Sequence, residues 1–520
     1  MTKPAAPPVA SRISEAAPGR WSRLAQRLGR HGGWSLLLLL AGALLFIYHL
    51  YRVTHGWVVD DAYISFRYAE NWVDGKGLVF NAGQRVEGYS NFLWVVLLAG
   101  GYALHLPTAA VAQMLGVALT LGALGWLLAI GRRMLGPRIG LCVAALYAAN
   151  HALMSWSFGG LELPLFLFLA LLGTYLLYVR ASPWALLGFA GAALTRPDGL
   201  LFLLVGLGWV WLPAGPCAGR SRRALASGCA IGLVVAHVGF ELVYYGSLVP
   251  NTFHAKVGFH LGQLTRGYDY LHDMASRYVV LLPAVLLLPF ARGQSAWRWY
   301  LLAVLGAYSA FVIYAGGDPH PGWRLALPLL PFAWLGLGVL LRSWKERAPG
   351  AALVLWFVLF ANDLWQALPG LPEGAAYAHF RTDKVASCGE RIGRWLDQQA
   401  PAGALIATNT GGSIPYFAKR LEALDMLGLT DADIAHSNRS VGTGYVGHEA
   451  HDGNYVLRRA PDYVFLCFSC NTSGPCLESD NALLADKRFT QGYERHEART
   501  EGMKFYYYTP KPPKARVVVH

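Results

Sequence analysis

Long apolar runs alternate with short polar segments over the first 367 residues of the chain. A helix needs about 20 residues to cross a hydrocarbon core of roughly 30 Å, so runs of this kind predict membrane helices. We therefore expect a polytopic α-helical membrane domain at residues 34–367. The apolar segments cover residues 34–51, 92–106, 108–130, 138–156, 163–179, 184–195, 199–213, 224–245, 277–291, 297–315, 325–341 and 350–367.

The pattern changes after about residue 368, where charged and apolar residues alternate over short distances, as they do in a soluble domain. About 150 residues suffice for a core of their own, so residues 368–520 are expected to form a C-terminal soluble α/β domain. Its predicted elements are a helix at 388–399 and strands at 405–408, 462–467 and 504–508.

Composition supports a membrane protein. The chain is 54% hydrophobic and 14% charged, whereas about 25% of residues are charged in soluble domains. The net charge of +13 would also suit a nucleic-acid partner, but much of the excess lies in short loops beside apolar runs. This distribution is typical of membrane topology, so membrane lipids are expected partners and nucleic acid is not.

The first 33 residues carry six basic residues and one acidic residue, which predicts a disordered cytoplasmic tail. No small-residue cleavage pattern follows the first apolar run, so we expect an uncleaved first helix. The topology depends on whether segment 92–106 crosses the membrane. Its 15 residues suit a short interfacial or re-entrant helix that does not cross. Eleven spans then remain and every basic loop lies in the cytoplasm, whereas a crossing segment would put these loops outside, so the positive-inside rule favours eleven spans.

In this arrangement the polar motifs of the membrane domain share the outer face, together with the C-terminal domain. Charged groups at helix ends in a membrane protein usually mark a functional site. The first outer loop, residues 52–107, contains two polar stretches, Asp60–Ala69 and Arg85–Trp94. The others are Gly159–Glu162, Thr195–Gly199, Leu248–Lys256 and Gly316–Arg324.

Four of the seven cysteines lie in the C-terminal domain: Cys388, Cys467, Cys470 and Cys476. An extracytoplasmic compartment permits disulfides, and an even number suits one or two bridges. The spacing of Cys467 and Cys470 would also fit half a zinc site or a redox pair, but no second such pair accompanies it. The other three cysteines lie in or beside apolar segments and are interpreted as packing residues.

Several motifs together resemble the GT-C superfamily of integral-membrane glycosyltransferases. Within it the chain is most similar to the mycobacterial terminal β-1,2-arabinofuranosyltransferases and their bacterial relatives, which include proteins that glycosylate pilin. The likeness spans roughly residues 55–465. It rests on Asp60–Tyr68, Val86–Trp94, Leu161-Glu162, Thr195–Gly199, Pro250–Thr252, Gly316–Asp318, Asp425–Asp431 and Gly447–Glu449.

The resemblance implies an inverting transferase in a bacterial cytoplasmic membrane, with its active site on the outer side. It would move a sugar, D-arabinofuranose by this likeness, from a polyprenyl monophosphate to a glycan or a pilin-type protein. One alternative function is a flippase or transporter for a lipid-linked sugar, which the lack of visible internal repeats disfavours. A second alternative is a non-catalytic envelope or motility protein that retains the fold.

Such a transfer needs a base for the acceptor hydroxyl and cations for the departing phosphate. Asp60 and Asp61 are the candidate bases, and the sequence leaves open which one acts and whether one of them caps the following helix. A metal is not expected, although oxygen ligands would suit Mg²⁺ or Mn²⁺. Candidate phosphate ligands are Lys256, His254, Arg196, Arg324, His320 and Arg67, and candidate sugar or acceptor ligands are Tyr63, Glu87, Tyr89, Asn91, Glu162, Asp198, Asn251 and Asp318. Each cation could instead contact lipid headgroups, and each aromatic ring could belong to an interfacial belt.

Overall fold

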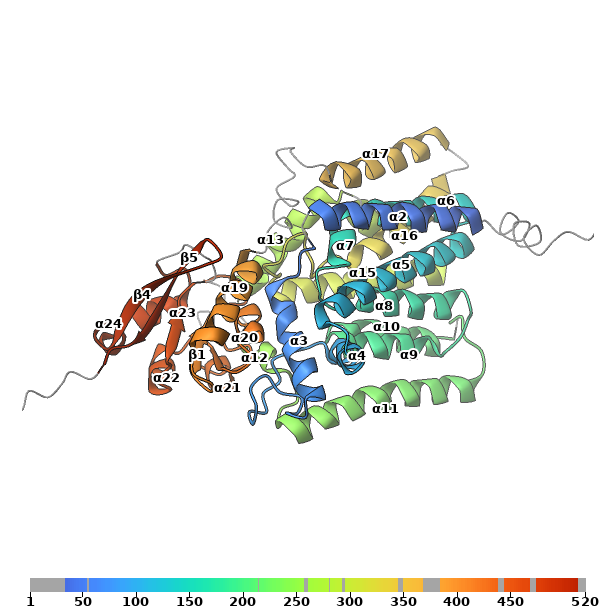
Figure 1. The fold of residues 1–520 in the computed structure, drawn as a ribbon. Coiled ribbons are helices and arrows are strands. Elements are labelled where there is room, and N and C mark those ends of the chain that lie inside the picture. Colours follow the sequence, from blue (N-terminus) through green and yellow to red (C-terminus); the bar gives the residue numbers. More distant parts are fainter. Residues whose placement is uncertain are drawn as a thin grey trace, which may run out of the picture.

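Leucine- and alanine-rich sequence forms long helices that run side by side as a bundle, and a C-terminal α/β domain lies against one end of it (Figure 1). The computed structural model describes residues 33–53, 56–213, 215–256, 261–279, 281–291, 295–344, 349–367, 384–437, 444–467 and 474–512. The predicted cytoplasmic tail, residues 1–33, lies outside these residues except at its last position.

Four helices in the described part of the chain are long and apolar enough to cross a membrane: α2 (Gly33–Val53), α5 (Thr108–Met134), α11 (Arg220–Tyr245) and α15 (Ser295–Ala315). The other helices of the bundle are shorter, so the eleven-span count stays a prediction. They are α4 (Phe92–Ala103), α6 (Pro137–Ala149), α8 (Leu163–Tyr178), α9 (Ala185–Thr195), α10 (Gly199–Trp211), α16 (Leu329–Trp344) and α17 (Pro349–Ala367).

Two of the predicted apolar helices are interrupted. The first, 138–156, divides at Asn150, whose side chain accepts a hydrogen bond from the backbone of Leu153 (3.0 Å) and so begins a new short helix, α7 (His151–Trp156). The second, 277–291, consists of the end of α13 (Leu261–Arg277), α14 (Leu281–Leu286) and a 3₁₀ turn, η1 (Leu288–Phe290). A single helix over 277–291 was therefore a wrong expectation.

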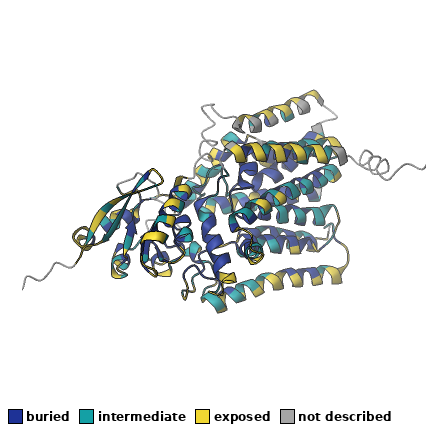
Figure 2. Cartoon of the chain, viewed as in Figure 1, coloured by how far each residue is buried: buried dark blue, intermediate teal, exposed yellow. Residues whose placement is uncertain are grey.

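Helix α3 (Asp60–Val73) lies where the bundle meets the C-terminal domain. Eleven of its 14 residues are buried, and it forms a dark central element in Figure 2. One face of α3 packs on the bundle. Gly160 permits a close approach to this face, because a Cβ on Gly160 would lie only 2.9 Å from the side chain of Ala62. Because Gly160 has a φ of +90°, a backbone conformation that favours glycine, its lack of a side chain serves both the turn and the close approach.

The C-terminal domain is built on a five-stranded sheet with the order β2-β1-β3-β5-β4. Strand β1 runs parallel to β2 and β3, while β5 pairs antiparallel with β3 and β4. Trp395 of helix α19 (Lys384–Gln399) packs against Phe505 and Tyr507 of β5. The strands are β1 (Leu405–Thr408), β2 (Glu422–Asp425), β3 (Tyr463–Phe465), β4 (Tyr493–Thr500) and β5 (Met503–Pro510).

The helix α19 and three strands thus lie where the sequence predicted them, whereas β2 and β4 were missed. Cys467 and Cys476 form a disulfide, and Cys388 is also disulfide-bonded. Cys470 lies outside the described residues, so the second half of the predicted Cys-x-x-Cys pair has no structural account.

The loops that follow strands β1 and β2 face the membrane domain. The first contains Gly412 and Ser413 and leads into helix α20 (Ser413–Phe417), which packs on α3. The second contains Leu429, which lines a cavity in the membrane domain. This edge of the sheet, where parallel strands end, is the one at which open α/β folds usually bind ligands, and here it binds the other domain.

Candidate active site

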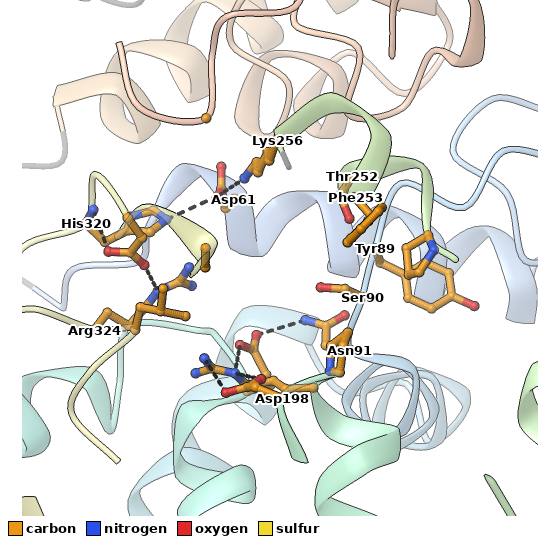
Figure 3. A pocket seen from close by; sticks show the side chains of 18 of the residues that line it. Asp61, Tyr89, Ser90, Asn91, Asp198, Thr252, Phe253, Lys256, His320 and Arg324 are labelled. Carbon is orange, nitrogen blue, oxygen red and sulfur yellow. Dashed lines mark hydrogen bonds and ion pairs between the residues drawn. The ribbon is translucent and has the colours of Figure 1, made fainter. Parts of the chain in front are cut away.

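A cavity of about 550 Å³ lies beside α3, where the helix ends of the bundle meet the C-terminal domain. Every polar motif that the sequence placed on the outer face contributes to it. Its lining includes Asp61, Asn91, Glu162, Arg196, Asp198, Lys256, Asp318, His320 and Arg324. Residues far apart in the sequence therefore meet at one site, as Figure 3 shows.

Asp61 faces the cavity with a lysine and a histidine as partners (Figure 3). Its Oδ2 atom lies 3.2 Å from Nε2 of His320 and 3.9 Å from Nζ of Lys256. Burial raises the pKa of the Asp61 carboxyl, but the charge of Lys256 and the hydrogen bond with His320 outweigh it, so the pKa lies well below its ordinary value. Asp61 is thus held as a carboxylate next to two groups able to bind an anion.

The loop after α15 holds a second charged pair. Arg324 Nε donates to Asp318 Oδ2 at 2.8 Å, and Asp318 Oδ1 accepts from the backbone N–H of His320 at 3.1 Å. Burial raises the pKa of Asp318, yet the nearby Arg324 charge keeps it below the ordinary value. Asp318 therefore orients both Arg324 and the loop that carries His320.

A third group of polar residues lines the cavity below Asp61 in Figure 3. Arg196 contacts two carboxylates, Asp198 at 3.0 Å and Glu162 at 4.0 Å. Glu162 accepts from Asn91 Nδ2 at 3.0 Å, and Asn91 also exchanges hydrogen bonds with Ser65 of α3. These contacts form a buried network that links the first outer loop to the helix ends of the bundle.

Asp60 does not line this cavity. Its carboxylate accepts hydrogen bonds from the backbone N–H groups of Gly412 (3.0 Å) and Ser413 (2.8 Å) and from the Ser413 hydroxyl. The two adjacent aspartates therefore have different surroundings: Asp61 faces the cavity and Asp60 binds the C-terminal domain.

Three further candidates hold parts of the protein together, away from the cavity. Arg67 donates to the backbone carbonyls of Phe80, Pro415 and Leu421, so its guanidinium joins the first outer loop to the C-terminal domain. Tyr63 packs against Tyr416 and Phe417 of that domain. Asn251 donates to the carbonyls of Gly428, Leu429 and Asp431.

Glu87 and His254 also lie outside the cavity lining. The buried Glu87 is beside Glu241, and burial together with the charge of Glu241 raises the pKa of Glu87 to about 9. The ring of His254 packs on His436 of the C-terminal domain, 4.3 Å between centroids. Tyr89, in contrast, lines the cavity, and its hydroxyl lies 3.2 Å from that of Tyr245.

The sequence reasoning missed Arg266, a fourth cation of the lining. It comes from α13 and pairs with Glu449 of the C-terminal domain. A partial signal for this pair was present in the sequence, because the resemblance included the motif Gly447–Glu449 but assigned no role to its residues. Gly447 lines the cavity, and a Cβ on it would lie 3.5 Å from the Lys256 side chain, so this loop lies directly against that lysine.

Among the residues that the structure describes, no group of three or more His, Cys, Asp or Glu side chains is placed to hold a metal ion. Charges of both signs instead line the cavity, with Asp61, Glu162, Asp198 and Asp318 facing Arg196, Lys256, Arg266 and Arg324. An anion that binds in this cavity would therefore contact cations that already pair with carboxylates.

The fold is shared with membrane glycosyltransferases. The structure of ArnT from Cupriavidus metallidurans bound to undecaprenyl phosphate aligns over 92% of this chain and 98% of ArnT, with a TM-score of 0.52 at 16% identity. The arabinofuranosyltransferase AftD from mycobacteria aligns over 91% of this chain and 40% of its own, with a TM-score of 0.51 at 14% identity. The chain has a GT-C fold.

Sequence comparison finds two terminal β-(1→2)-arabinofuranosyltransferases. That of Mycobacterium tuberculosis is 32% identical over 264 residues, which cover 45% of this chain and 40% of the relative. That of Corynebacterium glutamicum is 26% identical over 368 residues, 61% of this chain and 52% of the relative. The matches thus span about half the length of these relatives, and they agree with the resemblance seen in the motifs. A domain of unknown function (DUF8728) matches residues 376–509.

Proposed function

We propose that this protein is a membrane glycosyltransferase that moves a sugar, D-arabinofuranose, from a polyprenyl monophosphate to an acceptor hydroxyl, with Asp61 as the general base. The observation that carries the proposal is the position of Asp61 in a cavity with Lys256 at 3.9 Å and His320 at 3.2 Å. A carboxylate and anion-binding groups side by side are what this transfer requires. The names of the relatives support the choice of sugar.

The proposed step is a single displacement at the anomeric carbon. The acceptor oxygen forms a bond to this carbon while its proton passes to Asp61, and the bond from the carbon to the phosphate oxygen breaks. The polyprenyl phosphate leaves with the bonding electron pair, so no protonation of the leaving group is needed. A single displacement inverts the anomeric configuration, and NMR of the product tests this, because retention would contradict the mechanism.

Lys256, His320 and Arg324 are the proposed ligands of the donor phosphate. Lys256 and His320 approach Asp61 from the cavity side, and Arg324 is held by Asp318. Arginine offers two parallel N–H donors to phosphate, whereas lysine acts as a point charge. ArnT, which shares the fold, has been solved with undecaprenyl phosphate bound, which supports a donor of this kind.

The apolar side of the cavity is the proposed path of the prenyl chain. Leu201 of α10 and Phe311 of α15 line it together with Leu200 and Tyr314. The last two side chains are 40% and 39% exposed, so the lining extends to the surface of the bundle between these helices. An apolar chain leaving there would enter the surrounding lipid.

We propose that this cavity faces the outside of a bacterial cytoplasmic membrane, since the basic loops then lie in the cytoplasm. The acceptor would be an extracytoplasmic glycan or a pilin-type protein that approaches between the membrane domain and the C-terminal domain. Leu429, Val446 and Gly447 border that side of the cavity.

The test uses the full-length protein purified in detergent, a synthetic polyprenyl-phosphoryl arabinofuranose and an arabinoside acceptor. Wild type should transfer the sugar, and Asp61→Asn should lower kcat by about 10²–10⁴-fold, the usual contribution of a general base. EDTA should leave transfer unchanged, and its restoration by Mg²⁺ or Mn²⁺ after EDTA treatment would contradict metal independence. Donor binding without transfer by wild type would favour a role in handling the lipid carrier.

A further inference from the structure

The C-terminal domain contacts one face of helix α3 along most of its length. Asp60, Tyr63, Arg67 and Glu70 recur at the three- and four-residue spacing that puts side chains on one face of a helix. Each contacts the segment Gly412–Leu421, with Glu70 accepting from the Tyr416 hydroxyl at 2.6 Å and pairing with Lys419.

The cavity lies on a different face of the same helix. Asp61, Ile64 and Ser65 line it. A helix turns about 100° per residue, so neighbouring residues point in different directions. Asp60 and Asp61 are thus joined by one peptide bond, with Asp60 fixed on the C-terminal domain and Asp61 in the cavity.

From this geometry we infer that the C-terminal domain positions the general base: Gly412 and Ser413 hold Asp60 and so set where the Asp61 carboxylate lies. The inference rests on the proposed function and deepens it. Asp60 is then a positioning residue, and the role of the C-terminal domain includes assembling the reaction centre.

The contact at Gly412 is too close for any side chain. A Cβ on Gly412 would lie 1.9 Å from the backbone oxygen of Asp60 and 2.7 Å from its carbonyl carbon. Its φ is −97°, a conformation open to alanine, and the three atoms that a Cβ would meet first all belong to Asp60 of α3. A displacement of about 1 Å at a reacting group can lower a rate about 10²-fold.

The adjacent Gly411 provides a matched control. A Cβ there would meet the Asp425 carboxylate at 3.7 Å, an ordinary contact. The experiment compares Gly412→Ala and Gly411→Ala in the full-length protein, with kcat, donor KM and melting temperature measured for each. Gly412→Ala should lower kcat by at least about 10-fold with donor KM nearly unchanged, because the phosphate ligands lie on other elements, and Gly411→Ala should match wild type.

Ser413→Ala provides a second test that removes one hydroxyl donor to Asp60 and adds no bulk. Its control is Ser437→Ala, whose hydroxyl donates to the carbonyls of Ile434 and His451 within the C-terminal domain. A lower kcat for Ser413→Ala alone supports the inference, including where Gly412→Ala fails to fold. Equal kcat in both serine variants, or equal losses in both glycine variants, would overturn it while leaving the transferase activity in place. Absence of transfer by wild type would instead count against the proposed function.

Discussion

Nε2 of His320 lies 3.2 Å from Oδ2 of Asp61, although 259 residues separate them in the chain. The histidine is held in turn, since its backbone N–H donates to Asp318. With Lys256 on the same carboxylate oxygen, the proposed base and two proposed phosphate ligands form one cluster. In the proposed function, a donor phosphate that binds these two side chains would draw them away from Asp61 and leave its carboxylate more basic when the acceptor arrives.

Replacing Lys256 with methionine should move the acid limb of the pH–rate profile to higher pH. The lysine charge holds the pKa of Asp61 below its ordinary value, so its loss raises that pKa, and the base is protonated at a pH where the wild type is still ionised. The donor KM should also rise, since a phosphate ligand is lost. The measurement is kcat/KM from pH 8 down to the lowest pH at which both proteins stay folded, because the wild-type acid limb lies below the ordinary range of an aspartate. An unchanged acid limb would contradict the contact between this lysine and the base.

Asp198→Ala should destabilise the protein strongly. The change leaves the buried Arg196 guanidinium without its nearest carboxylate, which lies 3.0 Å away. Removing one partner of a buried ion pair costs about 3–5 kcal/mol. Melting temperature in detergent measures the effect, with Asp74→Ala as control, because its 3.6 Å pair with Lys76 is exposed and such pairs contribute about 0–1 kcal/mol. Equal stability of the two variants would contradict the network.

Glu87→Gln should make the protein more stable than wild type at alkaline pH. The folded-state pKa of Glu87 is raised to about 9, so the folded protein retains a proton that the unfolded chain has already released. Wild-type stability therefore falls as pH rises from the ordinary glutamate range toward 9, and a neutral amide at this position removes that loss. Melting temperatures at pH 6 and pH 9 check this, and an equal fall in both proteins would contradict it.

Leu201→Trp should weaken binding of a long-chain donor more than that of a short-chain donor. Leu201 lines the apolar side of the cavity, so a larger side chain would obstruct the proposed path of the prenyl chain. Donor KM would rise for a polyprenyl donor and change little for a farnesyl donor. Leu204→Trp is the matched control, because Leu204 lies one turn further along α10 and is 63% exposed. The same KM change in both variants would place the prenyl chain elsewhere.

The helical bundle and the α/β domain were predictable because apolar run length and the alternation of charged and apolar residues are local signals. The bounds of β1 were predicted at both ends, whereas β2 and β4 were missed. Strand β2 has four residues, and β4 is an edge strand whose sequence, YERHEART, carries charges that resemble a loop. Edge strands often carry such charges because their outer side faces water, and single-sequence patterns then fail to reveal them.

The site was predictable as a set of motifs but not as a set of roles. Asp60 and Asp61 are adjacent and chemically identical, and only the rotation of α3 decides which one faces the cavity. Arg67 satisfies backbone carbonyls of segments more than 340 residues away, a demand that no local pattern reveals. Arg266 was missed because it lies in α13, which carries none of the recognised motifs, and its partner Glu449 is 183 positions away in the chain.

The dependence of α3 on the C-terminal domain also bears on biogenesis. The bond between Asp60 and Ser413 joins residues 353 positions apart, so α3 leaves the ribosome long before its partner loop exists. Contacts of such long sequence separation form late, after the intervening chain has been ordered. Membrane insertion of the helices would therefore precede completion of the proposed reaction centre. In the proposed function, each newly made molecule would stay inert toward lipid-linked sugars until its C-terminal domain had folded against α3.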